Sequence, residues 1–387
     1  MNFEFTDDQN AIRQTLRAFV DAEIVPVARE WEQSGRYPTE IVESMRELGL
    51  FGITVPQEYG GSPLDGVSFA LVFEEISRGW MGIAGILGSH TLSCSLIARH
   101  GTDAQKQRYL AELAAGTRRT GIALTEPDAG TDLQGIRTVA RLEGDHYVVT
   151  GTKTWITNAR HADPLPVLVK TDPAAEPHHH GMSILLLDAG TPGFSVTRDI
   201  PKLGYHGTES CEVVLESARV PVENLLGGVE GRGMRQVLSG LEQGRVNVAA
   251  RSIGIAQRAY DEALAYARER RAFGQPIAQF QAIQLQLAQM ATQLQAARLL
   301  VYWAGTKLDE GSRADAETGM AKMFASEVAL QNAIESLKIH GGYGYSTEYE
   351  VERLYRDAIL MSIGEGTNDV LRTVIARSLV SGETVVR

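Results

Sequence analysis

Apolar residues recur three and four positions apart in the first part of the chain, and this spacing predicts amphipathic helices. Thr6 and Gln9 form a capping box ahead of the first run of such residues, and Thr102 and Gln105 repeat the pattern further along. Pro26 falls late in the first run, where it should kink or end the helix. We therefore expect a helical N-terminal domain over residues 1–117.

The pattern changes at Arg118, where the apolar period falls to two and β-branched residues become frequent. Gly144 and Asp145 are typical of a hairpin turn. Strands this short and evenly spaced are typical of a small β-barrel or sandwich, which we expect over residues 118–228. The predicted strands are Gly121–Leu124, Thr138–Leu142, Tyr147–Thr150, Lys153–Thr157, Pro166–Lys170, Ser183–Leu187, Phe194–Arg198 and Glu212–Leu215.

Helical spacing returns near Gly231 and predicts three long helices, Met234–Ala267, Gln279–Glu310 and Arg313–His340. Helices of this length are typical of a bundle, so we expect a C-terminal four-helix-bundle domain over residues 229–387. Their broad apolar stripes also favour packing between subunits. The predicted fold class is therefore α+β and multidomain, with a helical domain, a β domain and a helical bundle in that order.

Composition narrows the class of partner and compartment. The formal net charge of −11 argues against nucleic acid or an anionic membrane as a partner. Cys94 and Cys211 lie far apart, which predicts free buried thiols in a reducing compartment. The apolar segment Met81–Ile97 contains Gly, Ser, His and Thr and is interpreted as a buried helix, and no secretory signal is visible at the N-terminus. We therefore expect a cytoplasmic protein without a membrane span.

Several common active-site motifs are absent from the sequence. No Gly-x-Gly-x-x-Gly follows a predicted strand, and there is no phosphate-binding Gly-x-x-x-x-Gly-Lys-Ser/Thr, no His-Glu-x-x-His and no Gly-x-Ser-x-Gly. His178, His179 and His180 are adjacent in a predicted loop, and three adjacent residues cannot all face one ion. A solvated loop is favoured there over a metal site, and we predict no metal.

The stretch Ile359–Arg372 holds the candidate catalytic group. Glu365 stands between Gly364 and Gly366, so little side-chain bulk crowds its carboxylate, and Gly lets a ligand approach the backbone. Thr367 is a good N-cap for a helix whose free N–H groups and positive dipole end favour an anion. Taken alone, the same residues also fit a solvated turn with an exposed glutamate.

Three other stretches combine polar groups with turns. Leu124–Asp132 ends a strand in a turn rich in hydroxyls and N–H groups, which fits a polar ring edge or phosphate, or a turn that satisfies itself. Lys153–Asn158 places the indole of Trp155 near a strand end, where it covers a cofactor or fills a core. In Glu269–Gly274, Arg270 fits either a pyrophosphate or an ordinary helix C-terminus.

Together the four stretches resemble the acyl-CoA dehydrogenase family, and the resemblance runs from end to end. The motifs that carry it stand in the family order: Thr-Glu-Pro-Asp-Ala-Gly-Thr-Asp, Lys-Thr-Trp-Ile-Thr-Asn, Arg-x-x-Phe-Gly, Gly-Gly-Tyr-Gly and Glu-Gly-Thr-Asn. The helical, β, helical order of domains agrees with them. The resemblance implies the acyl-CoA dehydrogenase fold and an oxidoreductase that acts on CH–CH bonds.

The resemblance further implies FAD bound without a covalent link between the β domain and the bundle. Trp155 should cover one face of the flavin ring, and Thr157 should lie near its N5 atom. The implied cofactor contacts within one subunit are Leu124, Thr125, Gly130, Thr131, Trp155, Thr157, Thr367 and Asp369. Those that reach the FAD of a neighbouring subunit are Arg270, Phe273, Gln281, Lys338, Gly341 and Gly342.

Glu365 matches the family's general base, which removes the α-proton of an acyl thioester while the flavin accepts a hydride from the β-carbon. A dry pocket makes such a carboxylate more basic. Some members carry the base on the long helix instead, but the matching residue here is Gly244, which cannot serve. The substrate-binding residues implied are Thr131, Arg245, Gly364 and Gly366. The family often has Gly in place of Asp128 and an amide in place of Lys338 and Asp369, which puts some cofactor contacts in doubt.

The expected activity is FAD-dependent α,β-dehydrogenation of an acyl-CoA or acyl-carrier thioester to a trans-2-enoyl thioester, in fatty acid or amino acid catabolism. The alternatives are a flavin-dependent monooxygenase or oxidase on the same fold and a non-catalytic scaffold member, against which Glu365 and the intact flavin motifs speak. The resemblance also implies a homotetramer built as a dimer of dimers, and an electron-transferring flavoprotein as electron acceptor. Gly364, where the family often has Tyr, predicts room for a short or branched acyl group.

Overall fold

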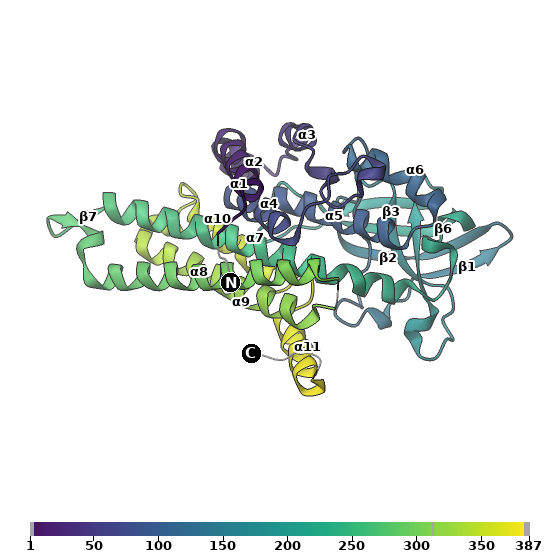
Figure 1. Ribbon diagram of the computed structural model, residues 1–387. Helices are drawn as coiled ribbons and strands as arrows, with labels where there is room; N and C mark the ends of the chain where they lie inside the picture. The colour runs from purple at the N-terminus through teal and green to yellow at the C-terminus, as the bar shows by residue number, and fades with distance from the viewer. Residues whose placement is uncertain (1–3, 312, 383–387) are drawn as a thin grey trace.

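A computed structural model describes residues 4–311 and 313–382, and it shows helices, then a sheet, then helices (Figure 1). The N-terminal part is built around two consecutive buried helices, α4 and α5, which both pack against α7. The helices of this part are α1 (Asp7–Phe19), α2 (Val25–Ser34), α3 (Thr39–Glu47), α4 (Gly66–Gly79), α5 (Met81–His100) and α6 (Asp103–Ala114). The predicted helical N-terminal part is confirmed.

Both predicted capping boxes are present. Thr6 and Gln9 bond each other's backbone N–H groups at the start of α1, and Thr102 and Gln105 do so at the start of α6. Pro26 does not end the first helix outright. A π-helical turn, Val20–Ile24, follows α1, and α2 then begins with Pro26 in its first turn, where the missing N–H is not needed. The chain therefore bends through a π turn instead of stopping.

The central part is one six-stranded mixed sheet with the strand order β4-β3-β1-β2-β6-β5. All neighbouring pairs are antiparallel except β1 and β3, which are parallel. The strands are β1 (Val139–Glu143), β2 (His146–Thr157), β3 (Leu165–Lys170), β4 (Met182–Leu187), β5 (Phe194–Asp199) and β6 (Ser210–Pro221). The end strands β4 and β5 are not paired with each other among the described residues, so the sheet stays open where a small barrel or sandwich was expected.

Three strand predictions need correction. Gly121–Leu124 forms no strand, because only Ala123 makes an isolated bridge, to Val167 of β3. The two predicted strands Tyr147–Thr150 and Lys153–Thr157 are one long strand, β2, whose pairing with β6 shifts register at two bulges. A bulge inserts an extra residue into a continuous strand and changes the face to which the following side chains point. The alternation of apolar and polar residues is interrupted there, so the sequence pattern suggests that the strand ends. The hairpin turn at Gly144 is confirmed, with Gly144 at φ 64°.

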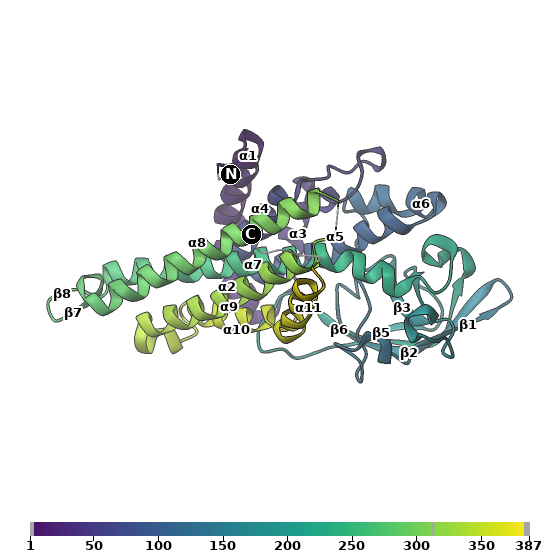
Figure 2. The same ribbon diagram turned by 60° about the horizontal axis from the view of Figure 1, so that its bottom comes forward.

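Five helices and a short hairpin form the described C-terminal part. The elements are α7 (Gly233–Glu269), β7 (Arg271–Ala272), β8 (Gln275–Pro276), α8 (Gln281–Asp309), α9 (Asp315–His340), α10 (Val351–Met361) and α11 (Asn368–Ser381). The three long helices α7, α8 and α9 all start and end within two residues of their predicted bounds. In Figures 1 and 2 the chain is elongated, with the β7–β8 hairpin at one end of α7 and α8 and the sheet at the other. These two ends carry different parts of the candidate site.

Helix α5 is the one helix of the described residues long and apolar enough to span a membrane, but 89% of its apolar window is buried inside the fold. This confirms that Met81–Ile97 lies in a buried helix. Cys94 on this helix and Cys211 on β6 are both buried and free, as expected. α5 packs on α7, and glycines at the contact bring the two backbones close together.

Candidate functional site

Glu365 lies in a strained turn between α10 and α11. Its φ is +56°, a left-handed conformation that is costly for a residue with a side chain, and Gly366 follows at +89°. Thr367 caps α11 by accepting a hydrogen bond from the Val370 N–H at 3.4 Å, as predicted. Asn368 donates its backbone N–H to the Ser362 carbonyl at 3.1 Å and closes the turn. The turn therefore holds one carboxylate in a fixed, unusual direction.

The carboxyl group of Glu365 reaches across to Gly244 on α7. A Cβ placed on Gly244 would stand 2.8 Å from Oε2 of Glu365 and 3.2 Å from its Cδ. Real Cβ atoms do not come this close to an oxygen, so the absence of a side chain at Gly244 is what makes room for the carboxylate. The position where some family members carry the base is thus the place that the carboxyl group of Glu365 contacts.

Burial raises the pKa of Glu365, because packed atoms replace water around the carboxylate. Three cations, Arg251, Arg245 and Lys322, oppose this shift and favour the ionised form. The opposing effects leave a carboxyl group that is more basic than usual and yet surrounded by positive charge. Such a group can accept a proton and remain stable while charged.

Lys322 on α9 was not singled out from the sequence. Its side chain is fully buried, and Nζ donates to the Gly366 carbonyl at 2.8 Å and to Oδ1 of Asn368 at 3.1 Å. Asn368 in turn bonds Ser326 through its Nδ2 at 3.0 Å. Burial lowers the pKa of Lys322 to about 8, while the nearby Glu365 carboxylate acts in the opposite direction. Lys322 therefore ties the turn that carries Glu365 to the long helix beneath it.

Arg245 is one residue after Gly244 and is 6% exposed. Its guanidinium Nη1 donates to Oδ1 of Asp315 at 2.8 Å and lies near the backbone carbonyl of the same residue. Arg313 pairs with the other oxygen of Asp315. Two arginines on one carboxylate hold the pKa of Asp315 below its usual range despite its burial. Arg245 is thus held in place by Asp315, and its Nε group is left without a hydrogen bond.

The second group of predicted residues lies where the Leu124–Asp132 turn meets β2. The Thr154 N–H donates to the Thr125 carbonyl at 2.9 Å, which joins the two motifs directly. Trp155 has a φ of +62°, and 55% of its surface is exposed although the residues on either side are buried. A bulge in β2 produces this exposure. Trp155 therefore presents its indole outward from the sheet instead of filling the core.

Buried charge holds this turn in place. Glu126 is 6% exposed and accepts hydrogen bonds from Lys153 Nζ at 2.8 Å and from the N–H groups of Arg137 and Thr138 at 2.6 and 3.0 Å. Burial lowers the pKa of Lys153 to about 8, and Glu126 acts against that shift. The motif residues Glu126 and Lys153 have a structural role, because their buried charged atoms bond each other. Neighbouring residues of the two motifs are the ones exposed to a ligand.

The remaining residues of this group leave space for a ligand. A Cβ built on Gly130 would meet only Thr125 Cγ2 at 3.9 Å, so the backbone there is open. Gly130 and Thr131 are exposed, and Leu124, Thr125 and Thr157 are partly buried. An exposed indole beside open backbone and hydroxyl groups fits a flat, polar ring such as a flavin.

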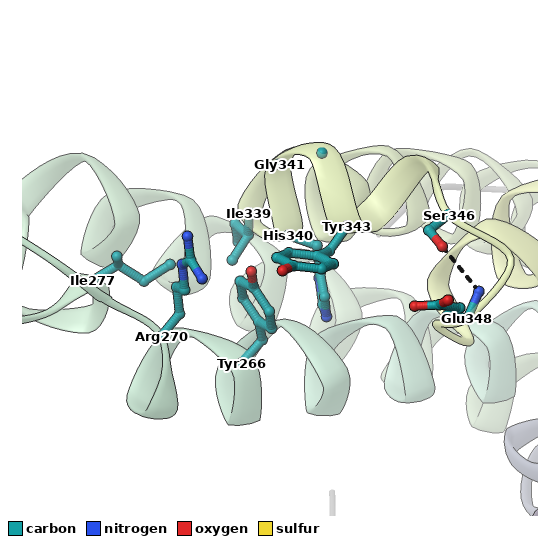
Figure 3. Close-up of a pocket in the computed structure, with 10 residues that line it drawn as sticks. Tyr266, Arg270, Ile277, Ile339, His340, Gly341, Tyr343, Ser346 and Glu348 are labelled. Carbon is teal, nitrogen blue, oxygen red and sulfur yellow. Dashed lines mark hydrogen bonds between the residues drawn. The ribbon is translucent and has the colours of Figure 1, made fainter.

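A third group forms a cavity of about 570 Å³ at the far end of the bundle (Figure 3). Arg270, at the end of α7, stands over the ring of Tyr343 with 5.7 Å between its Cζ and the ring centroid. The loop after α9 contributes Gly341 and Gly342, and a Cβ on either would meet no atom within 4 Å. Among the described residues Arg270 has no carboxylate within 4.0 Å. An unpaired guanidinium beside open glycine backbone fits an anion such as a pyrophosphate.

Not all predicted residues of this group line the cavity. Phe273, 96% exposed at a φ of 49°, lies at the tip of the β7–β8 hairpin, and Gln281 is exposed at the start of α8. Lys338 pairs with Glu335 at 2.9 Å on the surface of α9. Asp369, also exposed, accepts a hydrogen bond from Arg372 at 2.7 Å. The charges of Lys338 and Asp369 are thus engaged with neighbours on their own helices.

The structure brings the predicted residues together in three places: the Glu365 turn, the Trp155 bulge and the Arg270 cavity. The last lies at the hairpin end of the elongated chain, away from the sheet that carries Trp155 (Figures 1 and 2). Within the ranges 4–311 and 313–382 there is no cluster of His, Cys, Asp and Glu that could hold a metal ion. His178, His179 and His180 form an exposed or partly exposed 3₁₀ turn.

Comparisons with known proteins agree with the three-part organisation. The chain matches the N-terminal domain model of acyl-CoA dehydrogenases over residues 6–117, the middle domain model over 121–218 and the C-terminal domain model over 231–380. It is 43% identical to a probable acyl-CoA dehydrogenase of Bacillus subtilis (strain 168), covering 98% of this chain and 100% of that one.

Two further relatives were compared. The CarC subunit of the caffeyl-CoA reductase-Etf complex of Acetobacterium woodii is 39% identical, with 97% of this chain and 99% of that one covered. The solved butyryl-CoA dehydrogenase of Megasphaera elsdenii superposes with a TM-score of 0.95 at 37% identity, covering 98% and 100% of the two chains. The similarity therefore extends over all three parts of the chain.

Proposed function

The chain belongs to the acyl-CoA dehydrogenase family and is an FAD-dependent oxidoreductase of acyl-CoA CH–CH bonds, and we propose that Glu365 is its catalytic base. The observation that supports this assignment is the contact of the Glu365 carboxyl group with Gly244. It places the carboxylate in the narrow space between the turn and α7. The activity expected from the sequence is confirmed at the level of this class.

The chemistry assigned to Glu365 is removal of the α-proton of the thioester. Burial raises its pKa, so the carboxylate is a stronger base than one in water. Arg245, Arg251 and Lys322 act against this shift of the pKa and favour the ionised form of the carboxylate. The strained turn limits the directions in which the carboxylate can point. FAD, when bound, supplies the acceptor for the hydride that leaves the β-carbon.

The residues that would hold FAD are divided between the two ends of the chain. The sheet end offers Thr125, Trp155 and Thr157, and the hairpin end offers Arg270 with the Gly341–Gly342 loop. Because these ends lie apart in one chain, a single FAD that uses both sets needs two copies of the chain (Figure 1). This supports the proposed homotetramer, in which Arg270, Phe273, Gln281 and Lys338 face a neighbour's cofactor.

The direction of the reaction follows from the electron partner and not from Glu365. A carboxylate that removes an α-proton in one direction returns it in the other, and the Acetobacterium relative is named a reductase. That relative is also named as part of an Etf complex, which supports an electron-transferring flavoprotein as partner. We place the protein in the cytoplasm and in acyl-chain catabolism on the sequence argument alone.

The acyl group is proposed to be short or branched. A Cβ on Gly364 would meet only the Leu360 carbonyl, at 3.6 Å, so there is open space on that side of Glu365. A methyl branch near the α- or β-carbon would use this space. The thioester carrier is coenzyme A in the family, and an acyl-carrier protein is the alternative carrier.

The three domains are proposed to run over residues 1–117, 118–228 and 229–387.

The proposal is tested by anaerobic mixing of the purified yellow protein with a panel of acyl-CoA thioesters. Bleaching of the flavin absorbance is the expected result and identifies a dehydrogenase. A protein that takes up FAD but is bleached by no thioester would point to the monooxygenase or oxidase alternative. A protein that binds no FAD on titration would point to the scaffold alternative and overturn the assignment.

A further inference from the structure

Helices α5 and α7 pack closely against each other beside Glu365. A Cβ on Gly240 of α7 would meet Leu92 of α5 at 2.8 Å, and a Cβ on Gly88 of α5 would meet Nδ2 of Asn247 at 2.3 Å. Later residues of α7 therefore face earlier residues of α5, so the two helices run antiparallel. Helix α7 passes Glu365 at Gly244 and continues toward the start of α5.

Arg251 lies seven residues after Gly244, which puts both on one face of α7. The rise of the helix separates their Cα atoms by about 10 Å. The Arg251 charge favours the ionised form of the Glu365 carboxylate. Arg251 thus lies on the same face of α7 as Gly244, about two helical turns further along the helix.

Two other side chains contact the guanidinium of Arg251. Met81, the first residue of α5, has its Sδ 2.7 Å from Nη2 of Arg251. Tyr205 lies under the guanidinium, with 5.3 Å from Cζ to the ring centroid. The hydroxyl of Tyr205 fills the place of a side chain at Gly85, where a Cβ would stand 1.7 Å away. Tyr205 is itself fixed, because its N–H donates to Asp357 at 2.7 Å.

Arg251 differs from the other buried arginines in having no anionic partner. It is 7% exposed, its Nε has no hydrogen bond, and among the described residues no carboxylate oxygen lies within 4.0 Å of it. By contrast Arg245 pairs with Asp315 at 2.8 Å, and Arg298 pairs with Glu74 at 3.0 Å. A thioether is a weak acceptor, so the contact with Met81 does not compensate the buried charge. A buried cation without a partner is costly unless a ligand pairs with it.

We propose that Arg251 binds an anionic group at the distal end of the acyl chain, so that the preferred substrates are monothioesters of short dicarboxylic acids. This rests on the proposed role of Glu365 and adds the substrate class. An acyl chain of roughly four to six carbons, together with the reach of the arginine side chain, bridges the two helical turns between Gly244 and Arg251. The carboxylate supplies the charge-assisted hydrogen bonds that Arg251 lacks. Tyr205 and Met81 limit the length of the chain.

The test compares three CoA thioesters that carry different distal groups on the same three-methylene spacer: glutaryl-CoA with a carboxylate, its amide analogue and 5-methylhexanoyl-CoA with an isopropyl group. The holoenzyme should use glutaryl-CoA about 10- to 100-fold better in kcat/KM than the isopropyl analogue, with the amide between them. Arg251→Gln should reduce that preference to within a few-fold. The ratios of kcat/KM are measured at high pH, where Glu365 is ionised in both enzymes. The rise in the pKa of Glu365 that Arg251→Gln causes then does not alter the ratios between the three substrates.

FAD content and thermal melting show whether Arg251→Gln is folded, and Arg251→Lys should keep part of the preference. A wild-type enzyme that favours 5-methylhexanoyl-CoA overturns the proposal without any variant. So does an Arg251→Gln enzyme that loses all three substrates in equal proportion, because Arg251 would then act on Glu365 alone. If none of the three nor any other thioester bleaches the flavin, the proposed function fails instead.

Discussion

The Glu365 turn and the Arg270 cavity both contain charged side chains. They differ in how many of these side chains find a polar partner within the same chain. Near Glu365, two cations have partners within the chain. Lys322 donates a hydrogen bond to the turn, and Arg245 forms an ion pair with Asp315. In the Arg270 cavity the guanidinium has only an aromatic neighbour, and the glycine backbone is bare. The first region holds a proton acceptor whose turn is fixed by bonds within one chain. The second is incomplete and is shaped for a ligand that comes from outside it.

The largest effect should follow from Glu365→Gln. The amide keeps the shape of the turn but cannot accept a proton, so kcat should fall by roughly 10² or more, the scale of a positioned general base. FAD content should be unchanged. Stopped-flow measurement of flavin bleaching checks both. Turnover within a few-fold of the wild type would remove Glu365 from the role of base.

Gly244→Ala should cost about 10² in the rate of flavin reduction, because a Cβ 2.8 Å from Oε2 displaces the carboxylate by a fraction of an ångström. The displaced atom ends a flexible side chain, so thermal stability should change little. Gly240→Ala is the matched control, since its Cβ meets Leu92 one helical turn earlier. Equal losses in both variants would mean that the helix contact, and not the carboxylate, is sensitive.

Gly364→Tyr tests the open space on the other side of the base. The phenol should fill the space that a branch would use and shift the ratio of kcat/KM between isobutyryl-CoA and butyryl-CoA by roughly 10- to 200-fold. Wild-type enzyme should favour the branched thioester. The expectation is wrong if the wild type prefers the straight chain or if the tyrosine variant loses both substrates equally.

Arg270→Ala should weaken FAD binding by roughly 10- to 100-fold, the scale of one charge-assisted contact to a phosphate, with little change in the rate of the FAD-loaded enzyme. Flavin release during ultrafiltration measures it. Arg268→Ala removes an exposed charge two residues earlier and should not matter. A monomer in sedimentation that still holds FAD tightly would contradict the shared cofactor.

Lys322→Met should have the smallest effect on the maximal rate and a visible effect on its pH dependence. The wild-type rate should rise with pH as Glu365, whose pKa is raised by burial, loses its proton. Without the Lys322 charge that pKa rises further, so the rising limb of kcat/KM moves to higher pH. Lys307→Met, which breaks a surface pair with Glu310, is the control and should leave the profile in place. An unmoved profile in Lys322→Met would refute the coupling.

The sequence predicts well what local patterns determine. Both capping boxes, the long helices and the Thr367 cap follow from side chains within four residues of each other, and the motif residues Glu365, Trp155 and Arg270 follow from a family resemblance. The strands Gly121–Leu124 and Tyr147–Thr150 were mistaken because bulges and isolated bridges depend on a partner strand.

Lys322 and Arg251 show why the rest of the site was missed. Lys322 stands in the middle of a helix, where a lysine ordinarily faces water, and it is buried only because the Glu365 turn folds over it from 44 residues away. Arg251 looks like any other arginine of α7 until Tyr205 and Met81 are seen around it. Whether a charged side chain is buried depends on tertiary contacts. The spacing of residues along the chain therefore does not predict it.

The closeness of Gly244 and Glu365 restricts how such an enzyme can evolve. Moving the base from the turn to the helix needs two substitutions, and each order passes through a poor intermediate. One has no base at all, and the other has two carboxylates in one dry space, where they cannot both be ionised. Every single-substitution path between a base on the turn and a base on the helix therefore passes through a less active enzyme. A lineage that has the base at one of these positions is expected to keep it there.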